Sequence, residues 1–259
     1  MIETWSSGAA DASMSEDLLV ELSDTVRRHP WWIARADLAL TLLRRNGIQP
    51  PAYVLDIGCG WGTNLVALEN AGYRVSGLDI SRRALERIDK AERHLIEADL
   101  SQDLPATTPL ADAVLAIDII EHIDDDRAAL ARIATLARPG GVAVVSVPAL
   151  PELFSNFDAV QQHRRRYLPH SLRAAFESTE LQVRSIFWWG AWMVPVLRRM
   201  RLRESAAVQA TRSYSDYLRL PPWPGPRLMS LAFALEKPLA VRQMLRTGTS
   251  LIAVATRAV

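Results

Sequence analysis

Three glycines at alternate positions stand in the stretch from Val54 to Gly62, directly after a short apolar run and an acid. A helical pattern begins at Thr63, so the stretch reads as a strand, a tight turn and a helix. Glycine allows the sharp turn and lets a ligand lie directly against the backbone, where a Cβ atom would intervene. The stretch therefore predicts a nucleotide-like ligand at the end of the first strand of an α/β sheet.

The spacing of the glycines indicates which ligand. A dinucleotide fingerprint, Gly-x-Gly-x-x-Gly, needs glycine where Thr63 stands. The acid at Asp56 is also unfavourable beside a pyrophosphate. The spacing therefore disfavours a nicotinamide-dependent oxidoreductase. The acid at Asp56 suits a cationic or amino ligand instead. The other alternative is a binding module that has the same glycine turn but no catalytic activity.

The residues from Val54 to Gly62 resemble the first motif, Asp-x-Gly-x-Gly-x-Gly, of the class I S-adenosylmethionine-dependent methyltransferases. The resemblance implies S-adenosyl-L-methionine as the cofactor and S-adenosyl-L-homocysteine as its product. In this stretch it implies cofactor contacts from Asp56, Gly58, Cys59, Gly60 and Asn64. We interpret Cys59 as a packing residue rather than a nucleophile, because a small side chain is sufficient in the turn.

Acids at two later strand ends extend the predicted cofactor site. The strand from Tyr73 to Ile80 carries Asp79, whose carboxylate is suited to accept both ribose hydroxyls. Ile80 joins it as a cofactor contact. By the same resemblance Asp99 lies near the adenine amino group, with Leu100 beside the ring.

A histidine and two tryptophans precede an arginine in the segment from His29 to Arg35. It resembles a His-x-Trp-Trp stretch in one branch of these methyltransferases. The resemblance implies that Arg35 binds the carboxylate of the cofactor's methionine end, a bidentate task suited to guanidinium. Alternatively, Trp31 and Trp32 belong to the core and Arg35 caps a surface.

Glu121 and His122 follow the apolar strand that begins at Ala113, at the sheet edge where α/β proteins bind ligands. The pKa of histidine suits proton removal from a hydroxyl near neutral pH, so His122 is a candidate general base that Glu121 could orient. With Asp118 they also resemble the acid-x-x-Glu-His stretch of the ubiquinone-pathway O-methyltransferases. That stretch offers a second hypothesis, a Mg²⁺ ion held by Asp118, Glu121 and His122. A third is cofactor contact or positioning, with Asp118 at the cofactor; we favour a site without metal.

The basic segment from His163 to Tyr167 resembles a His-x-Arg-x-Tyr stretch that lies near the substrate in relatives. We expect His163, one arginine and Tyr167 to face the site as further catalytic candidates. The alternative is a solvated basic loop.

Three tryptophans, at positions 188, 189 and 192, precede a run of arginines from Arg198 to Arg203. They predict the wall of an apolar substrate pocket, an interfacial helix on a membrane surface, or a homodimer interface. The segment lies in an insertion of about 60 residues before the last strand, residues 188–248, which we call the cap insertion.

The composition fits one globular enzyme domain of 259 residues with 49% hydrophobic residues. A net charge of +1 disfavours nucleic-acid binding, and a single cysteine without an export signal predicts a cytoplasmic protein. We expect residues 1–15 to be disordered, residues 16–50 to form helices, residues 51–148 to form the cofactor-binding core and residues 149–259 to shape the substrate site.

The predicted fold is a doubly wound, seven-stranded, mostly parallel Rossmann-like sheet, with an antiparallel last strand inserted between the fifth and sixth. The predicted reaction is methyl transfer to a small, partly apolar molecule, most simply O-methylation in secondary-metabolite or quinone-like biosynthesis. An N- or C-acceptor, or a lipid-linked substrate at a membrane surface, is the alternative.

Overall fold

The structure, a computed structural model, describes residues 2–6, 22–88, 93–105, 110–206 and 218–259. Eight strands form one sheet in the order β1-β4-β3-β2-β5-β6-β8-β7. Their bounds are β1 (Ile2–Thr4), β2 (Tyr53–Ile57), β3 (Arg74–Asp79), β4 (His94–Glu97), β5 (Ala111–Ile117), β6 (Ala137–Pro148), β7 (Leu181–Trp189) and β8 (Ser250–Arg257). The first six pair in parallel, and β8 is antiparallel to both of its neighbours. This confirms the Rossmann-like sheet and the place of its last strand.

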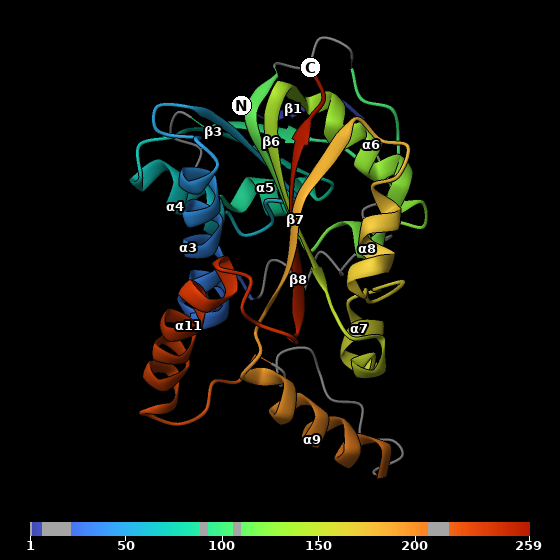
Figure 1. Cartoon of the computed structure of the whole chain (residues 1–259). Coiled ribbons are helices and arrows are strands. Elements are labelled where there is room, and N and C mark those ends of the chain that lie inside the picture. The colour runs from blue at the N-terminus through green and yellow to red at the C-terminus, as the bar shows by residue number, and fades with distance from the viewer. Residues whose placement is uncertain (1, 7–21, 89–92, 106–109, 207–217) are drawn as a thin grey trace.

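Helices cover both faces of the sheet (Figure 1). They are α2 (Ser23–Arg28), α3 (Pro30–Arg45), α4 (Thr63–Asn70), α5 (Arg82–Arg87), α6 (Asp126–Leu136), α7 (Asn156–Val160), α8 (Pro169–Ala175), α9 (Met193–Ala206) and α11 (Gly225–Val241). Two short 3-10 turns, η2 (Ile120–His122) and η3 (Pro151–Leu153), complete them. One core cluster packs α3, α4 and α11 against the sheet, and another packs α6 and α8 against its other face.

Strand β1 corrects the expectation of a seven-stranded sheet, and it gives a defined structure to residues 2–4 of the segment 1–15 that was expected to be disordered. Ile2 pairs with Leu95 on the free edge of β4, and its side chain packs on a small apolar cluster. Glu3 adds an ion pair with His94 at 2.7 Å. Backbone pairing and this packing are enough to order a segment whose composition alone favours disorder. Residues 7–15, and the first part of the helix expected from residue 16, lie outside the described residues.

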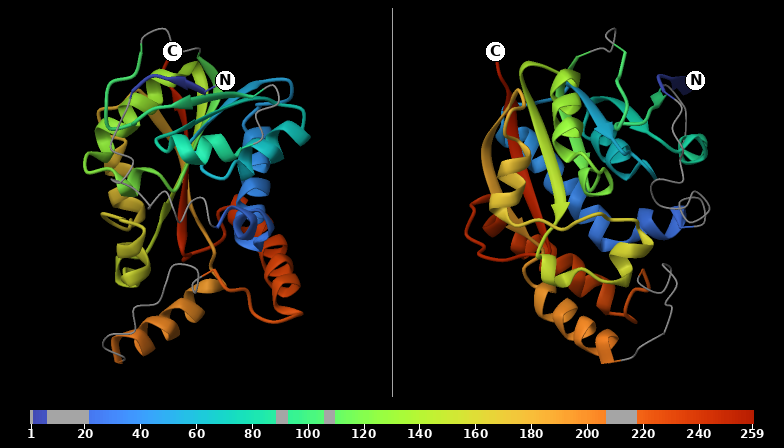
Figure 2. Two further views of the ribbon diagram at one scale, coloured as in Figure 1. Left: turned by 180° about the vertical axis from the view of Figure 1, so that it is seen from behind. Right: turned by 90° about the vertical axis from the view of Figure 1, so that its right-hand side faces the viewer.

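The cap insertion supplies α9 and α11. Helix α11 packs along α3 and β7, whereas α9 contacts the turn η3. Figure 2 shows α9 at the end of the molecule away from both termini. Helix α9 thus lies beyond the carboxyl ends of the parallel strands, where the candidate site residues gather, whereas α11 packs on one face of the sheet.

Candidate active site

A cavity of about 1000 Å³ opens at the carboxyl ends of β2, β3, β4 and β5. Its remaining walls come from the segment around α7, from α9 and from the start of α11. Every predicted cofactor residue except Asp56 lines it: Arg35, Gly58, Cys59, Gly60, Asn64, Asp79, Ile80, Asp99, Leu100 and Asp118. The volume lies at the upper end of the range for small-molecule sites, which leaves room for a cofactor and an acceptor together.

The glycine turn has the predicted backbone. Gly58, Gly60 and Gly62 have φ values of 66°, 44° and 73°, a left-handed conformation that L side chains rarely adopt. A Cβ atom on Gly77 of β3 would lie 2.7 Å from the Sγ atom of Cys59. The turn therefore packs closely on the neighbouring strand, which explains a small, buried Cys59 and fits its predicted packing role.

Asp79 joins β3 to the glycine turn. Its Oδ2 atom accepts a hydrogen bond from Gly60 N–H at 2.7 Å, and its Oδ1 atom accepts one from Ser81 N–H at 2.9 Å. The carboxylate is held rigidly at the cavity wall, so it can meet two adjacent hydroxyl groups without first being ordered. Asp99, also on the wall, is fixed in the same way by Ser101 N–H at 2.8 Å.

Asp56 does not line the cavity. It is completely buried below the turn, and its Oδ1 atom accepts a hydrogen bond from the Asn64 amide at 3.1 Å. Burial raises the pKa of Asp56 to about 7. The structure therefore places Asp56 where it orients Asn64, which does reach the cavity, and the expected direct contact is replaced by an indirect one.

Arg35 is buried inside the site rather than capping a surface. Its guanidinium pairs with Asp118 and with the hydroxyl of Ser146. It also lies 5.0 Å from the ring centroid of Trp31 and 5.7 Å from that of Trp189. These contacts fix Arg35 and Asp118 as one charged unit on the cavity wall, with further donors of the planar guanidinium available for a carboxylate.

His122 and His163 meet edge to face in the wall of the cavity, with ring centroids 4.7 Å apart. Burial, with a smaller contribution from His163, lowers the pKa of His122 to about 4. Glu121 is fully buried and does not line the cavity. Burial and the neighbouring Asp118 raise the pKa of Glu121 well above its usual range.

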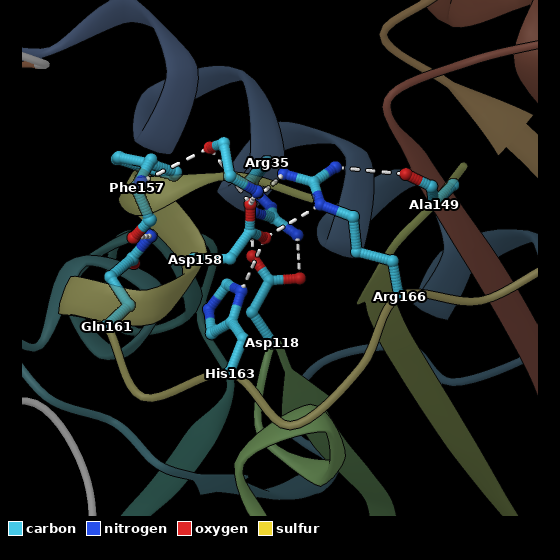
Figure 3. A network of polar contacts seen from close by, with 9 residues as sticks. Arg35, Asp118, Ala149, Phe157, Asp158, Gln161, His163 and Arg166 are labelled. Carbon is cyan, nitrogen blue, oxygen red and sulfur yellow. Dashed lines mark hydrogen bonds and ion pairs between the residues drawn. The ribbon is translucent and has the colours of Figure 1, made fainter. Parts of the chain in front are cut away.

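Asp158 is a site residue that the sequence analysis missed. Its carboxylate lies between His163 and Arg166, at 3.0 Å from His163 Nδ1 and 2.7 Å from Arg166 Nε (Figure 3). Although its burial opposes ionisation, the hydrogen bond from His163 and the charge of Arg166 keep the pKa of Asp158 below its ordinary value. A signal was present, because Ser155 and Asp158 form a capping box at the start of α7.

The basic segment brings His163 and two arginines, Arg164 and Arg166, to the cavity lining, where one arginine was expected. The side chain of Arg166 is buried, whereas Arg164 and Arg165 are partly exposed and pair with Asp124 and Asp126. Tyr167 also differs from the expectation, since its side chain is buried away from the cavity and donates a hydrogen bond to Asp126 at 2.8 Å. Burial and this acid raise the pKa of Tyr167, and its position leaves it no direct contact with a substrate.

Glu121, His122 and His163 also form a group with metal-ligand chemistry. One ligand atom of each lies within 4.8 Å of the others, and neither carboxylate oxygen of Glu121 has a protein partner. The group differs from the one expected from the sequence, because His163 takes the place of Asp118, which pairs with Arg35.

The rest of the lining suits a partly apolar ligand. Trp192, Met193, Val196, Leu197, Met200 and Met229 form an apolar wall from the cap insertion. Several buried polar atoms of the lining have no protein partner, among them Thr63 Oγ1, His122 Nδ1, Trp192 Nε1 and Thr249 Oγ1. Because unpaired buried polar atoms are costly, these atoms point to a ligand that hydrogen-bonds along the cavity.

The geometry of the cavity lining is suited to bind S-adenosylmethionine. The space above Gly60 is open, since a Cβ atom there would come no closer than 3.9 Å to any neighbour. A fixed carboxylate stands at Asp79, and a guanidinium stands at Arg35. A nucleoside joined to an amino acid needs this combination of a bare turn, a sugar acceptor and a carboxylate donor.

Comparison with known proteins supports the same site. The pattern of a family described as a methyltransferase domain matches residues 31–186. A ubiquinone biosynthesis O-methyltransferase of Ralstonia nicotianae is 32% identical over 131 residues, which cover 44% of this chain and 54% of the relative. An O-methyltransferase of Pyrenophora dematioidea is 28% identical over 158 residues, 58% of this chain and 59% of the relative. The chain thus spans a little over half the length of these relatives.

Solved structures with the same fold include a SAM-dependent methyltransferase of Archaeoglobus fulgidus, with a TM-score of 0.52 and 18% identity over 86% of this chain and 94% of that one. Magnesium protoporphyrin IX methyltransferase of Synechocystis PCC 6803, solved with bound SAM, has a TM-score of 0.51 and 16% identity over 87% of this chain and 79% of that one. The family pattern covers more than half of the chain, including the glycine turn and the histidine pair. The chain therefore belongs to the methyltransferase domain family, which confirms the family predicted from the residues around Gly60.

Proposed function

We propose that this chain is an S-adenosylmethionine-dependent methyltransferase that methylates a hydroxyl group on a small, partly apolar molecule. The observation that carries the proposal is the pair of histidines on the cavity wall, one of them hydrogen-bonded to the buried Asp158 at 3.0 Å. The histidine pair and the glycine turn line the same cavity.

The predicted residues would bind the cofactor in one half of the cavity. Asp79 accepts from the ribose hydroxyls, Asp99 and Leu100 face the adenine, and Arg35 offers a donor to the methionine carboxylate. When bound, S-adenosylmethionine supplies a methyl group on a positively charged sulfur, which is already activated for transfer. The protein then has to orient the acceptor, exclude water and remove one proton.

Proton removal is best assigned to His163. In an aspartate-histidine pair, the carboxylate fixes the tautomer in which the Nδ1 atom carries hydrogen, so the Nε2 atom is free to accept a proton. Asp158 is placed to do this for His163. His122, whose pKa is about 4 because of its burial, stays neutral and is suited to guide the acceptor hydroxyl.

The acceptor class follows from the two kinds of wall. The tryptophan and methionine side chains of the cap insertion suit an apolar ring or chain, while the histidines suit its hydroxyl group. Similarity to ubiquinone biosynthesis O-methyltransferases supports a phenolic hydroxyl of the quinone-precursor or secondary-metabolite kind. The family match ends at residue 186, before the cap insertion, so the identity of the ring rests on the cavity itself.

Two measurements test the proposal. Calorimetry with S-adenosylmethionine, and with NADH for comparison, should give heat with the first alone. Turnover should then be measured by S-adenosylhomocysteine formation with dihydroxylated phenols and with amines of matched size. Methylation of the phenols that falls in a His163→Ala variant supports the proposal, whereas methylation of the amines alone, unaffected by that variant, overturns it.

A further inference from the structure

Helix α11 carries apolar side chains on its outer face as well as its inner one. Leu228, Leu231, Leu235 and Leu239 are exposed by 59%, 55%, 65% and 40%. Their spacing of three, four and four residues places them on one side of the helix. We call these four residues the leucine stripe. On the opposite side, Phe233 and Ala240 are buried in the core, so the stripe is the face of the helix turned away from the core.

The charges around the leucine stripe have one sign. Arg227 and Arg242 stand at its two ends, and Arg246 follows; all three are exposed. Glu236, the acid of this helix, is buried and accepts hydrogen bonds from Gly190 N–H at 2.5 Å and Trp192 N–H at 3.2 Å. Lys237 pairs with Asp37 of α3. The stripe is therefore an apolar surface with a positive rim.

An exposed tryptophan extends this surface beyond the start of the helix. Trp223 is 75% exposed, and the guanidinium of Arg227 lies 5.9 Å from its ring centroid. Tryptophan and arginine side by side are typical of the interface between water and lipid, where the ring enters the headgroup region and the cation meets phosphate.

We propose that the leucine stripe, with Trp223 and the rim arginines, docks this protein in the plane of an anionic membrane surface. A second copy of the chain is the other apolar partner to consider. A twofold interface through the stripe would bring the arginine rims of both copies together without an exposed acid on α11 to neutralise them. Anionic lipid supplies the missing negative charge. Among the described residues no helix is both long and apolar enough to cross a membrane.

The leucine stripe is a different surface from the tryptophans at 188, 189 and 192, for which the sequence offered a membrane contact as one interpretation. Trp189 is buried and Trp192 packs against Phe233, so these side chains point inward. The docking surface instead adjoins the cavity from outside, because Met229 of α11 and the preceding Leu220 and Pro221 belong to the cavity lining. Docking would bring this side of the cavity close to the lipid.

Flotation of the whole chain with vesicles tests the proposal without any catalytic readout. One vesicle is pure phosphatidylcholine and the other contains a fraction of phosphatidylglycerol. We expect binding to the anionic vesicle, about tenfold weaker in a Leu231→Ser, Leu235→Ser double variant because less apolar area enters the lipid. In an Arg227→Gln, Arg242→Gln double variant, the affinity for anionic vesicles should fall by about fivefold for each charge removed.

Leu110→Ser is the matched control, since Leu110 is 47% exposed and far along the chain from α11. It should bind as the wild type does, and all variants should keep their melting temperature because the changed side chains face solvent. Equal binding by the leucine variant and the wild type would overturn the proposal. So would a wild-type chain that ignores both vesicles and sediments as a dimer that the leucine variant abolishes, which would assign the stripe to a second copy.

Discussion

The Nδ1 atom of His163 lies 3.0 Å from the Oδ1 atom of Asp158, a carboxylate with no exposure to solvent. The same carboxylate binds Arg166, so it keeps its negative charge in a buried position. It therefore fixes the orientation of an imidazole that forms part of the cavity wall. A positioned histidine of this kind is worth about a hundredfold or more in proton transfer, which makes the pair the most informative place to test the chemistry.

Replacing Asp158 by asparagine should lower kcat by about tenfold to a hundredfold while the affinity for S-adenosylmethionine stays within about twofold, because the change alters the tautomer of His163 and not the cofactor wall. A His163→Ala variant should lose a similar amount. The double variant should be no slower than His163→Ala alone, because Asp158 acts through the histidine. Initial rates under saturating cofactor measure all three.

Ser155→Ala is the control for that series, since it removes the capping hydroxyl of α7, with its 3.3 Å hydrogen bond to Asp158, and leaves the contacts of the carboxylate with His163 and Arg166 in place. Independent, multiplying losses in the double variant would mean that Asp158 does not act through His163.

Asp79 should govern the affinity for the cofactor. Removing its carboxylate in an Asp79→Ala variant loses charge-assisted hydrogen bonds to the ribose, and the dissociation constant should rise by about tenfold to a hundredfold. Calorimetry with S-adenosylhomocysteine measures it. Asp103→Ala is a matched control, since Asp103 is a fully exposed acid paired with Arg132 at the surface. An Asp79→Ala variant that binds S-adenosylhomocysteine as tightly as this control does would show that Asp79 does not bind the ribose.

Chelation of divalent cations should leave turnover unchanged. The motif acid Asp118 pairs with Arg35, and burial with the nearby Asp118 favours the protonated form of Glu121, which is a poor metal ligand. Rates before and after exhaustive treatment with EDTA check this. A loss that added Mg²⁺ restores would instead assign a metal to Glu121, His122 and His163.

The buried Asp56 should make the folded state less stable as the pH rises. Its pKa is about 7 in the folded chain and near 3.8 in the unfolded one, so between these values the folded state binds more protons. The free energy of unfolding contributed by this group therefore falls from pH 4 to pH 7. An Asp56→Asn variant, which keeps the carbonyl acceptor for Asn64, should gain stability over the wild type as the pH rises through this range.

The comparison of the two chains cancels the opposite trend of His29, whose pKa burial lowers to about 4. Urea unfolding at several pH values gives the difference directly. A difference that stays constant with pH would show that Asp56 ionises normally in the folded chain.

Glu236 should be needed to hold the cap insertion on the sheet. In a Glu236→Ala variant the buried N–H of Gly190 and the partly buried N–H of Trp192 lose their acceptor, and we expect a loss of about 2 to 4 kcal/mol in stability. The neighbouring Lys237→Ala change removes only a surface pair with Asp37 and should cost less than about 1 kcal/mol. Thermal unfolding compares them, and equal losses would contradict the role of Glu236.

The cofactor half of the molecule could be predicted because the sequence features that indicate it are local. The glycines at 58, 60 and 62 need their backbone conformation whatever the tertiary structure, and the acid at Asp79 follows from the parallel strand order. The glycine turn and the parallel strands around it agree with the structure for this reason, whereas the antiparallel last strand and the cavity positions of Arg35 and His163 were expected from the family resemblance.

What the sequence did not yield depends on contacts between distant segments. Composition could not show that Ile2 would pair with Leu95, or that the phenol of Tyr167 would find Asp126 rather than the cavity. Asp56 was placed at the cofactor because one-dimensional spacing does not separate a residue that lines a wall from one that supports it. The outward leucines of α11 escaped notice because an apolar helix pattern does not say which side is covered.

Strand β8 lies between β6 and β7, yet it follows the whole cap insertion along the chain. Neither neighbour can complete its pairing until α9 and α11 have been synthesised and have left the ribosome. A nascent chain therefore carries the tryptophans and leucines of the insertion uncovered while β6 and β7 still lack the strand between them. We expect this interval to be the one in which chaperones engage the protein, and shortening the insertion should speed its maturation.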